Sequence, residues 1–95
     1  MVLELAVLSV RSGQGTAFET AFREAEPILS AAGGYVRHEL RRCVELSDRY
    51  VLLVWWTSLE AHTDGFRGSP GYARWKSLLH HFYDPFPDVE HYTTL

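Results

Sequence analysis

The seven-residue run YVLLVWW, from Tyr50 to Trp56, limits the fold of this chain more than any other part of its sequence. Its residues are apolar at odd and even positions alike, and successive side chains of a strand point to opposite faces of the sheet. A strand of this composition needs cover on both faces. We therefore expect a central strand here, within a longer strand that spans 49–57.

Three further segments are predicted to be strands. Val2 to Arg11 is rich in Val and Leu and is too short for a buried helix with caps. Tyr35 to Leu46 alternates roughly, which is typical of a strand with one wetter face. Val89 to Thr94 follows the rigid loop DPFPD and forms a last short strand. The tight turn at Ser47 and Asp48 predicts a hairpin between the second strand and the central one.

Helical spacing marks the two intervals between these strands. From Gln14 or Gly15 to Ala32, apolar residues recur at steps of three and four. Pro27 lies late in this run and should kink the helix or loosen its last turns. After the central strand, GFRGSPGY interrupts the pattern. We expect one short helix there over about 58–67 and another over about 70–82, with Pro70 in its first turn.

The predicted order is strand, helix, strand, strand, helix, strand. This order favours an α+β fold with the ferredoxin-like βαββαβ arrangement, in which the helices cover one face of a four-stranded antiparallel sheet. The other face is left bare, and a bare apolar face in a small domain favours a homodimer through the sheet. With 95 residues, we expect the chain to be a single domain over 1–95.

Composition narrows the classes of function. The net charge is -3 and there is no basic run, which argues against nucleic-acid binding. There is no apolar stretch of about 18 residues and no signal-peptide pattern, so we expect no membrane association and a cytoplasmic location. The single Cys43 rules out an internal disulfide. We interpret it as a buried structural cysteine in preference to a catalytic thiol.

His62 is the strongest candidate for chemistry. His62 and Phe66 are four residues apart and share a helix face, which Leu59 completes and which should look onto the sheet. An imidazole in that place can hold a substrate hydroxyl or take its proton near neutral pH. The alternative is a half-buried histidine that bonds to a backbone carbonyl.

Aromatic residues gather in the same part of the chain. A stripe along the later helix consists of Tyr72, Trp75, Leu79 and Phe82. Such rings can fill a core, or they can form flat walls around a ring-shaped ligand. Trp55 and Trp56 must point to opposite faces of their strand, and the sequence leaves open which one faces the helices. We expect a small aromatic substrate to contact Trp56, Phe66, Tyr72 and Trp75.

Adjacent imidazoles at His80 and His81 raise the question of a metal site. Neighbouring positions on a helix point about 100° apart, so one ion cannot easily use both side chains. No Asp, Glu or Cys lies nearby at helical spacing. We therefore expect no metal site, and interpret the pair as solvated side chains at a helix end.

Two stretches, LLVWWTSLEAHTDGFRGSPGYARW and the ending FPDVEHY, resemble the antibiotic biosynthesis monooxygenase (ABM) domain family of the dimeric α/β-barrel group. The resemblance extends over nearly the whole chain. It implies two ferredoxin-like protomers joined through their sheets, each with a cavity between sheet and helices. It also implies the chemistry of those members that oxidise aromatic polyketides with dioxygen and without metal, flavin or haem. In those members the substrate anion itself passes an electron to oxygen.

Haem-degrading relatives use an Asn, a Trp and a His, which correspond here to Ala6, Phe66 and Lys76, so the resemblance does not imply haem breakdown. Three functions stay open. The first is a cofactor-independent monooxygenase for a phenolic or polycyclic substrate, with His62 as base or hydrogen-bond partner. The second is a non-catalytic small-molecule-binding or stress-linked dimer. The third is a structural dimer whose rings fill the core, and an empty cavity would argue against it.

Overall fold

A computed structural model describes residues 1–95 and has the predicted order of elements. The strands are β1 (Val2–Ser9), β2 (Tyr35–Arg42), β3 (Arg49–Trp56) and β4 (Val89–Thr93). The helical elements are α1 (Gly15–Ser30), the π-helix η1 (Ala61–Phe66), α2 (Pro70–Leu79) and the 3-10 helix η2 (His80–Phe82).

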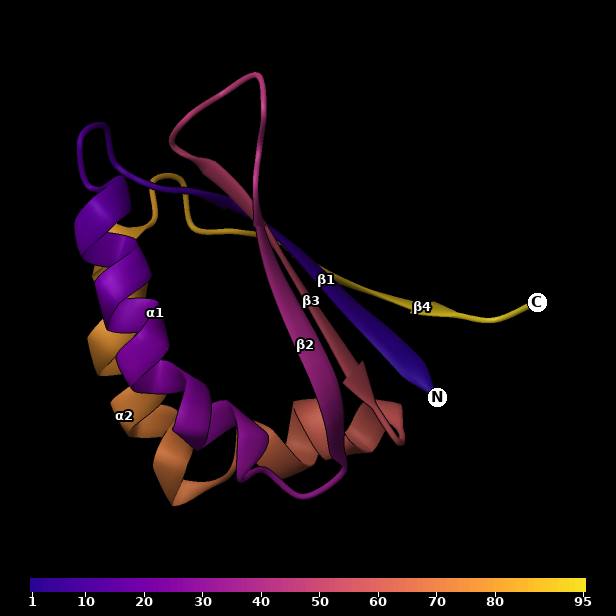
Figure 1. Cartoon of the computed structure of the whole chain (residues 1–95). Coiled ribbons are helices and arrows are strands. Elements are labelled where there is room, and N and C mark those ends of the chain that lie inside the picture. Colours follow the sequence, from indigo (N-terminus) through magenta and orange to yellow (C-terminus); the bar gives the residue numbers. More distant parts are fainter.

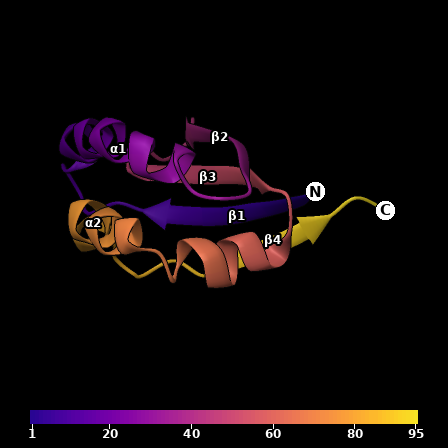
Figure 2. The same cartoon turned by 90° about the horizontal axis from the view of Figure 1, so that it is seen from below.

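All four strands form one antiparallel sheet in the order β2-β3-β1-β4, which is the ferredoxin-like α+β arrangement. The apolar strand β3 lies inside the sheet, as its composition predicted, and β1 lies beside it. Figure 1 shows both α1 and α2 on the same side of the sheet. Figure 2 shows the strands in the same order from below. The two helices also pack against each other.

The strand register gives each side chain a face. Even-numbered residues of β1 and β3 face the helices and, apart from Val2 at the start of β1, are buried, whereas odd-numbered residues face the open side. Trp56 therefore points toward the helices and is fully buried. Trp55 points to the open side, where the Arg37 guanidinium carbon lies 3.6 Å from its ring centroid. The structure thus shows that Trp56, and not Trp55, faces the helices.

Helix α1 closes the core on one side. Its buried residues are Phe18, Phe22, Ala25 and Leu29, which recur at helical spacing. Pro27 was expected to kink the helix or loosen its last turns, and α1 runs on for three residues to Ser30. There the Ala31 N–H donates to the Pro27 carbonyl at 3.1 Å. A proline lacks an N–H but still accepts, so the helix ends regularly beyond it.

The strand β2 ends earlier than predicted, at Arg42 instead of Leu46. The Cys43 N–H donates to the carbonyl of Arg49 at 2.7 Å, and this bond closes the ladder before the chain turns. Cys43 was predicted to be buried within the strand. This prediction is wrong, because the side chain lies at the strand end, is only partly buried and has its Sγ 3.5 Å from Glu45.

The first helical segment after β3 is also different from the prediction. Leu59 and Glu60 are already helical, directly after Ser58, whose Oγ accepts from the Ala61 N–H at 3.1 Å. From Ala61 to Phe66 the segment is a π-helix, with the Arg67 N–H donating to the His62 carbonyl five residues back at 3.2 Å. His62 and Phe66 both point inward and are buried. Leu59 lies before the π-helix and is 41% exposed, so the prediction that it completes their face is wrong.

The sheet face opposite the helices has no cover within the protomer, as predicted. Its apolar residues on the two interior strands are Leu3, Leu5, Val7, Val51, Leu53 and Trp55. The charged residues Arg37, Glu39 and Arg41 of β2 lie beside them and pair with one another. No helix of the chain is both long enough and apolar enough to cross a membrane.

Candidate functional site

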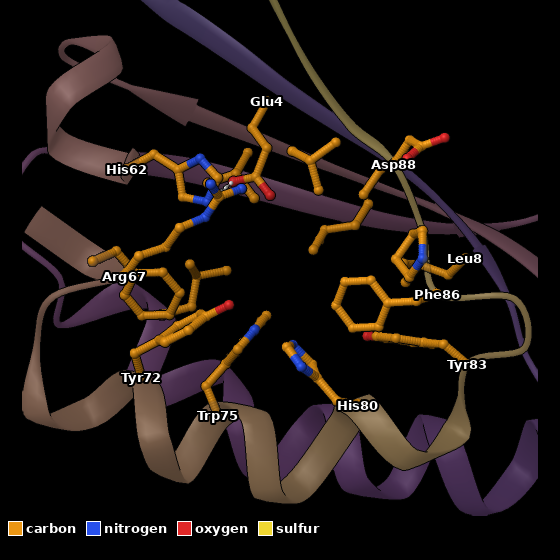
Figure 3. A pocket seen from close by; sticks show the side chains of 17 residues that line it. Glu4, Leu8, His62, Arg67, Tyr72, Trp75, His80, Tyr83, Phe86 and Asp88 are labelled. Atoms are coloured by element: carbon orange, nitrogen blue, oxygen red, sulfur yellow. Dashed lines mark ion pairs between the residues drawn. The ribbon is translucent and has the colours of Figure 1, made fainter. Parts of the chain in front are cut away.

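A cavity of about 490 Å³ lies between the sheet and the helical layer (Figure 3). Side chains of β1 and β3 form its floor, and η1, α2 and η2 form the opposite wall. The loop before β4 closes one end with Phe86 and Pro87. Eleven of the 17 lining residues are hydrophobic, and the volume falls within the range of small-molecule pockets. Phe66 and Trp75 therefore belong to the core and at the same time border this space.

Three aromatic side chains form one wall of this cavity. Phe66 comes from η1, and Tyr72 and Trp75 come from α2. The Phe66 ring meets Tyr72 edge-on at 5.4 Å between centroids and Trp75 edge-on at 5.6 Å. These T-shaped contacts fix the rings relative to one another. The Phe66 ring stands nearly perpendicular to the other two, and the wall is apolar apart from one phenolic hydroxyl at Tyr72.

Trp56 does not line the cavity, although it was predicted to contact the substrate. It lies fully buried behind His62, with the two rings stacked at 5.3 Å between centroids and 17° between planes. Its indole N–H donates to the Glu4 Oε1 atom at 2.9 Å. Trp56 therefore supports the polar groups of the cavity from behind.

Glu4 is the buried carboxylate of the cavity, and the sequence reading did not single it out. Its Oε1 accepts the Trp56 hydrogen bond, whereas Oε2 has no protein partner. No fully buried polar side-chain atom in the chain lacks a partner, so Oε2 is open to the cavity that Glu4 lines. Burial raises the pKa of Glu4, although the Trp56 hydrogen bond and the charge of Arg67 act in the opposite direction.

His62 connects Glu4 to a second histidine. Its Nε2 lies 3.4 Å from Glu4 Oε1, and its Nδ1 lies 2.8 Å from Nε2 of His91, which is opposite Glu4 in the β1–β4 ladder. Burial, followed by the charges of Arg67 and His91, lowers the pKa of His62 to about 4. The ring is therefore neutral at neutral pH, and its contact with Glu4 is not an ion pair.

The His62 ring is hydrogen-bonded at one of its two nitrogens. Its Nδ1 shares a hydrogen bond with Nε2 of His91 at 2.8 Å, and the tautomers of the two rings decide which nitrogen donates. The Nε2 atom of His62 lies 3.4 Å from Glu4 Oε1 without a hydrogen bond between them. Among Glu4, His62 and His91, the free oxygen of Glu4 is the basic atom that faces the cavity.

The structure thus brings four of the predicted residues, His62, Phe66, Tyr72 and Trp75, around one cavity. It adds Glu4, Arg67, His80 and Tyr83, which the sequence reading missed. A signal for Glu4 was present, since a charged residue in an apolar strand shares parity with the buried side chains of that strand.

His80 and His81 were interpreted as solvated side chains. This interpretation is wrong for His80, which is partly buried and lines the cavity, and burial followed by the Lys76 charge lowers its pKa. His81 is exposed, as expected. The helix tightens to a 3-10 turn at His80, which changes the direction of both side chains from that of a continued α-helix. No three His, Cys, Asp or Glu side chains are grouped to hold a metal ion.

The sequence model of the antibiotic biosynthesis monooxygenase (ABM) family matches residues 1–78, so this chain belongs to that family. A relative that is 53% identical over 92 residues is the uncharacterized protein YczJ of Bacillus subtilis (strain 168), and the match covers 97% of each chain.

Solved structures share the fold. A Bordetella bronchiseptica protein assigned by name to the antibiotic biosynthesis monooxygenases superposes with a TM-score of 0.94 at 29% identity, over 99% of this chain and 96% of that one. SnoaB of Streptomyces nogalater, named as a cofactor-independent oxygenase, superposes with a TM-score of 0.86 at 22% identity, over 99% and 92% of the two chains.

Proposed function

We propose that this chain is a cofactor-independent monooxygenase that oxidises an aromatic, polyketide-like small molecule with dioxygen in the cavity between sheet and helices. The observation that carries the proposal is a buried carboxylate, Glu4, whose free oxygen opens into a cavity bordered by aromatic rings. Family membership and the name of SnoaB support the same class of reaction.

Glu4 serves as the base in this proposal. A flat ring system packs against Phe66, Tyr72 and Trp75, and an acidic C–H or O–H of the ligand meets Glu4 Oε2. The raised pKa of Glu4 makes it a stronger base than an ordinary carboxylate. His62 acts as a positioning residue beside Glu4, because its Nε2 lies 3.4 Å from Glu4 Oε1, its Nδ1 is hydrogen-bonded to His91 and its pKa is low.

The reaction balances without an external reductant. For an anthrone, Glu4 removes one proton from the central CH₂, and the resulting anion gives one electron to dioxygen. The substrate radical and superoxide then combine into a carbon-bound peroxide. Cleavage of its O–O bond, with loss of the second C–H proton, releases water and leaves the quinone, so anthrone and dioxygen become anthraquinone and water. The cavity contributes orientation and exclusion of bulk water.

Oxygen uptake with an anthrone in air tests this function. We expect uptake above the spontaneous background for the wild type and a loss of about 100-fold or more for Glu4→Gln, as is typical when a general base is removed. Glu24→Gln is the matched control, because Glu24 is exposed and pairs with Arg74 away from the cavity. Equal uptake in the wild type and Glu4→Gln would overturn the proposal.

His62→Ala separates the two roles considered for the histidine. A partner of Glu4 should cost less activity than Glu4 itself, so we expect a reduced rate that lies between those of the wild type and Glu4→Gln. A wild-type rate in His62→Ala would remove His62 from the mechanism. A rate as low as that of Glu4→Gln would mean that His62 is as important for the reaction as Glu4.

A non-catalytic small-molecule-binding role is the second candidate. It is favoured by the state of His62, whose low pKa keeps the ring neutral and whose Nδ1 is bonded to His91, so that Glu4 is left as the base beside it. In that case the protein binds a flat aromatic ligand but consumes no oxygen above the background with any anthrone or hydroquinone.

We also propose that the protein forms a homodimer through the open sheet face. Six apolar residues of β1 and β3 lie on that face, and Val7 is 44% exposed in the protomer. An apolar face of this kind, with the charged residues of β2 at one side, has the composition of a dimer interface.

A further inference from the structure

We propose that Arg67 and Glu4 together bind an ionisable hydroxyl of the ligand, with Glu4 accepting its proton and Arg67 holding the oxyanion that results. The ligand class is then a phenol or an enolisable aromatic ketone, in contrast to an aromatic carboxylate. The role of these two residues in oxidation rests on the proposed function. Their binding of the hydroxyl can be measured without any oxidation.

Arg67 is placed by the π-helix that precedes it. Its N–H donates to the carbonyl of His62 at 3.2 Å, which ties the start of its side chain to the same turn. Figure 3 shows the side chain running from this turn toward Glu4 and His62. Arg67 is the only arginine or lysine among the lining residues. A tighter helical turn would aim residue 67 elsewhere.

The guanidinium has no protein partner. Five of the other arginines form ion pairs with carboxylates, but Arg67 makes no side-chain hydrogen bond and no ion pair within 4.0 Å. Arg67 is exposed overall but also lines the cavity with Glu4 and His62. Its charge lowers the pKa of Glu4, His62 and His91. A planar donor fork is therefore free beside a carboxylate oxygen that is also free.

The two groups together select one ligand chemistry. A hydroxyl donates to Glu4 Oε2 while it is protonated, and as an oxyanion it accepts from Arg67. A permanent carboxylate satisfies Arg67 but is repelled by Glu4, and an unsubstituted ring satisfies neither. A positive charge within a few ångströms stabilises an oxyanion and lowers the pKa of the hydroxyl, by about one to three units.

The other titratable groups of the cavity do not supply this charge. Burial lowers the pKa of His80 and raises the pKa of Tyr83, so both are neutral near neutral pH. Figure 3 shows the Asp88 carboxylate directed away from the cavity at the opposite end from Arg67. Arg67 is thus the cation available to a ligand oxyanion beside Glu4.

The test uses 2-hydroxyanthraquinone, which is already a quinone and changes colour when its hydroxyl ionises. The wild-type protein is titrated with this probe over a range of pH, and the pH at which the bound probe ionises is read from the absorbance. We expect this pH to lie at least about one unit below that of the free probe. Anthraquinone-2-carboxylate, of the same ring system, should bind at least about 10-fold more weakly.

Variants assign the effect to Arg67. Arg67→Gln should raise the ionisation pH of the bound probe by about one unit or more, and Arg67→Lys should restore most of the wild-type value. Arg74→Gln is the control, because Arg74 is exposed and pairs with Glu24 outside the cavity. Glu4→Gln should remove the discrimination against the carboxylate probe. Circular dichroism checks that each variant is folded.

An unchanged ionisation pH in Arg67→Gln, or tighter binding of the carboxylate than of the hydroxyl probe by the wild type, would overturn the pairing. Failure of the proposed function looks different. Without oxygenase activity, the anthrone assay gives no uptake above background while the Arg67-dependent shift of the inert probe persists.

Discussion

The Trp56 indole donates a hydrogen bond to the Glu4 carboxylate at 2.9 Å, although 52 residues separate them in the chain. The β1–β3 register explains the contact. Val2 lies opposite Trp56, and Glu4 is two residues farther along the same face, so the two side chains are diagonal neighbours. The central pairing of the sheet therefore positions the carboxylate of the candidate site.

Replacing the indole should weaken both the fold and the site. Trp56→Phe removes the donor to Glu4 and leaves a buried carboxylate less satisfied, at a cost of about 1–3 kcal/mol in the free energy of unfolding. Urea unfolding measures this cost. Trp55→Phe is the matched control on the open face, where we expect a change of about 1 kcal/mol or less. A Trp56→Phe cost no larger than the control would contradict the importance of the bond.

Stability should fall on mild acidification because of His62. Its pKa of about 4 in the folded protein is below the ordinary 6.5, so the unfolded chain takes up the proton first as the pH decreases. The contribution of His62 is complete above pH 6.5 and is lost progressively toward pH 4. The pKa of Glu4 is raised, so its effect has the opposite sign. Its contribution to the free energy of unfolding decreases as the pH rises above the ordinary pKa of a glutamate.

The variant His62→Gln isolates the histidine contribution. Between pH 6.5 and pH 4.5 we expect the wild type to lose about 2 kcal/mol more unfolding free energy than the variant. Urea unfolding at several pH values measures the two slopes. Parallel slopes would mean that His62 titrates normally in the folded protein.

A close approach of backbone and helix should make Gly34 hard to replace. Gly34 has φ +81, and a β-carbon there would lie 2.5 Å from the Ala61 Cβ and 2.8 Å from the Thr57 Oγ1. Gly34→Ala should therefore destabilise the fold by about 2 kcal/mol or more. At Gly33 a β-carbon meets nothing within 4 Å, so Gly33→Ala should be nearly neutral. Similar melting temperatures for the two variants would contradict this prediction.

The proposed dimer can be tested at Val7. This side chain is 44% exposed on the open face of β1, so a charge is tolerable in a monomer but not in an apolar interface. We expect Val7→Asp to shift the protein from dimer to monomer in light scattering after gel filtration. Val44→Asp, at a residue that is 94% exposed in the β2–β3 connection, should leave the dimer intact. If the wild-type protein is a monomer in this measurement, the proposal of a homodimer is wrong.

Local patterns in the sequence were sufficient for the arrangement of elements. The apolar run of β3, the spacing of Phe18 and Phe22 in α1, and the glycines before β2 each act over a few residues. Such patterns cannot indicate a change of helical pitch. Leu59, just before the π-helix, is exposed, and the π-helix gives residue 67 its direction; neither outcome follows from a spacing of three or four residues.

The walls of the site were more predictable than its polar centre. Phe66, Tyr72 and Trp75 lie within ten residues of one another in the chain, Phe66 at the end of η1 and the other two on α2. Glu4, His62 and His91 come from β1, η1 and β4: the β1–β4 register sets His91 opposite Glu4, and the packing of η1 on the sheet brings His62 to both. A single sequence contains no direct record of that register.

The carboxylate of the cavity is anchored to the sheet, whereas its aromatic walls come from the helical half of the chain. A substitution at Tyr72 or Trp75 therefore reshapes the space offered to a ligand while Glu4 keeps its indole donor on β3. Across descendants of such a chain, ligand preference can diverge through a handful of ring exchanges, and the proton-accepting chemistry is inherited intact.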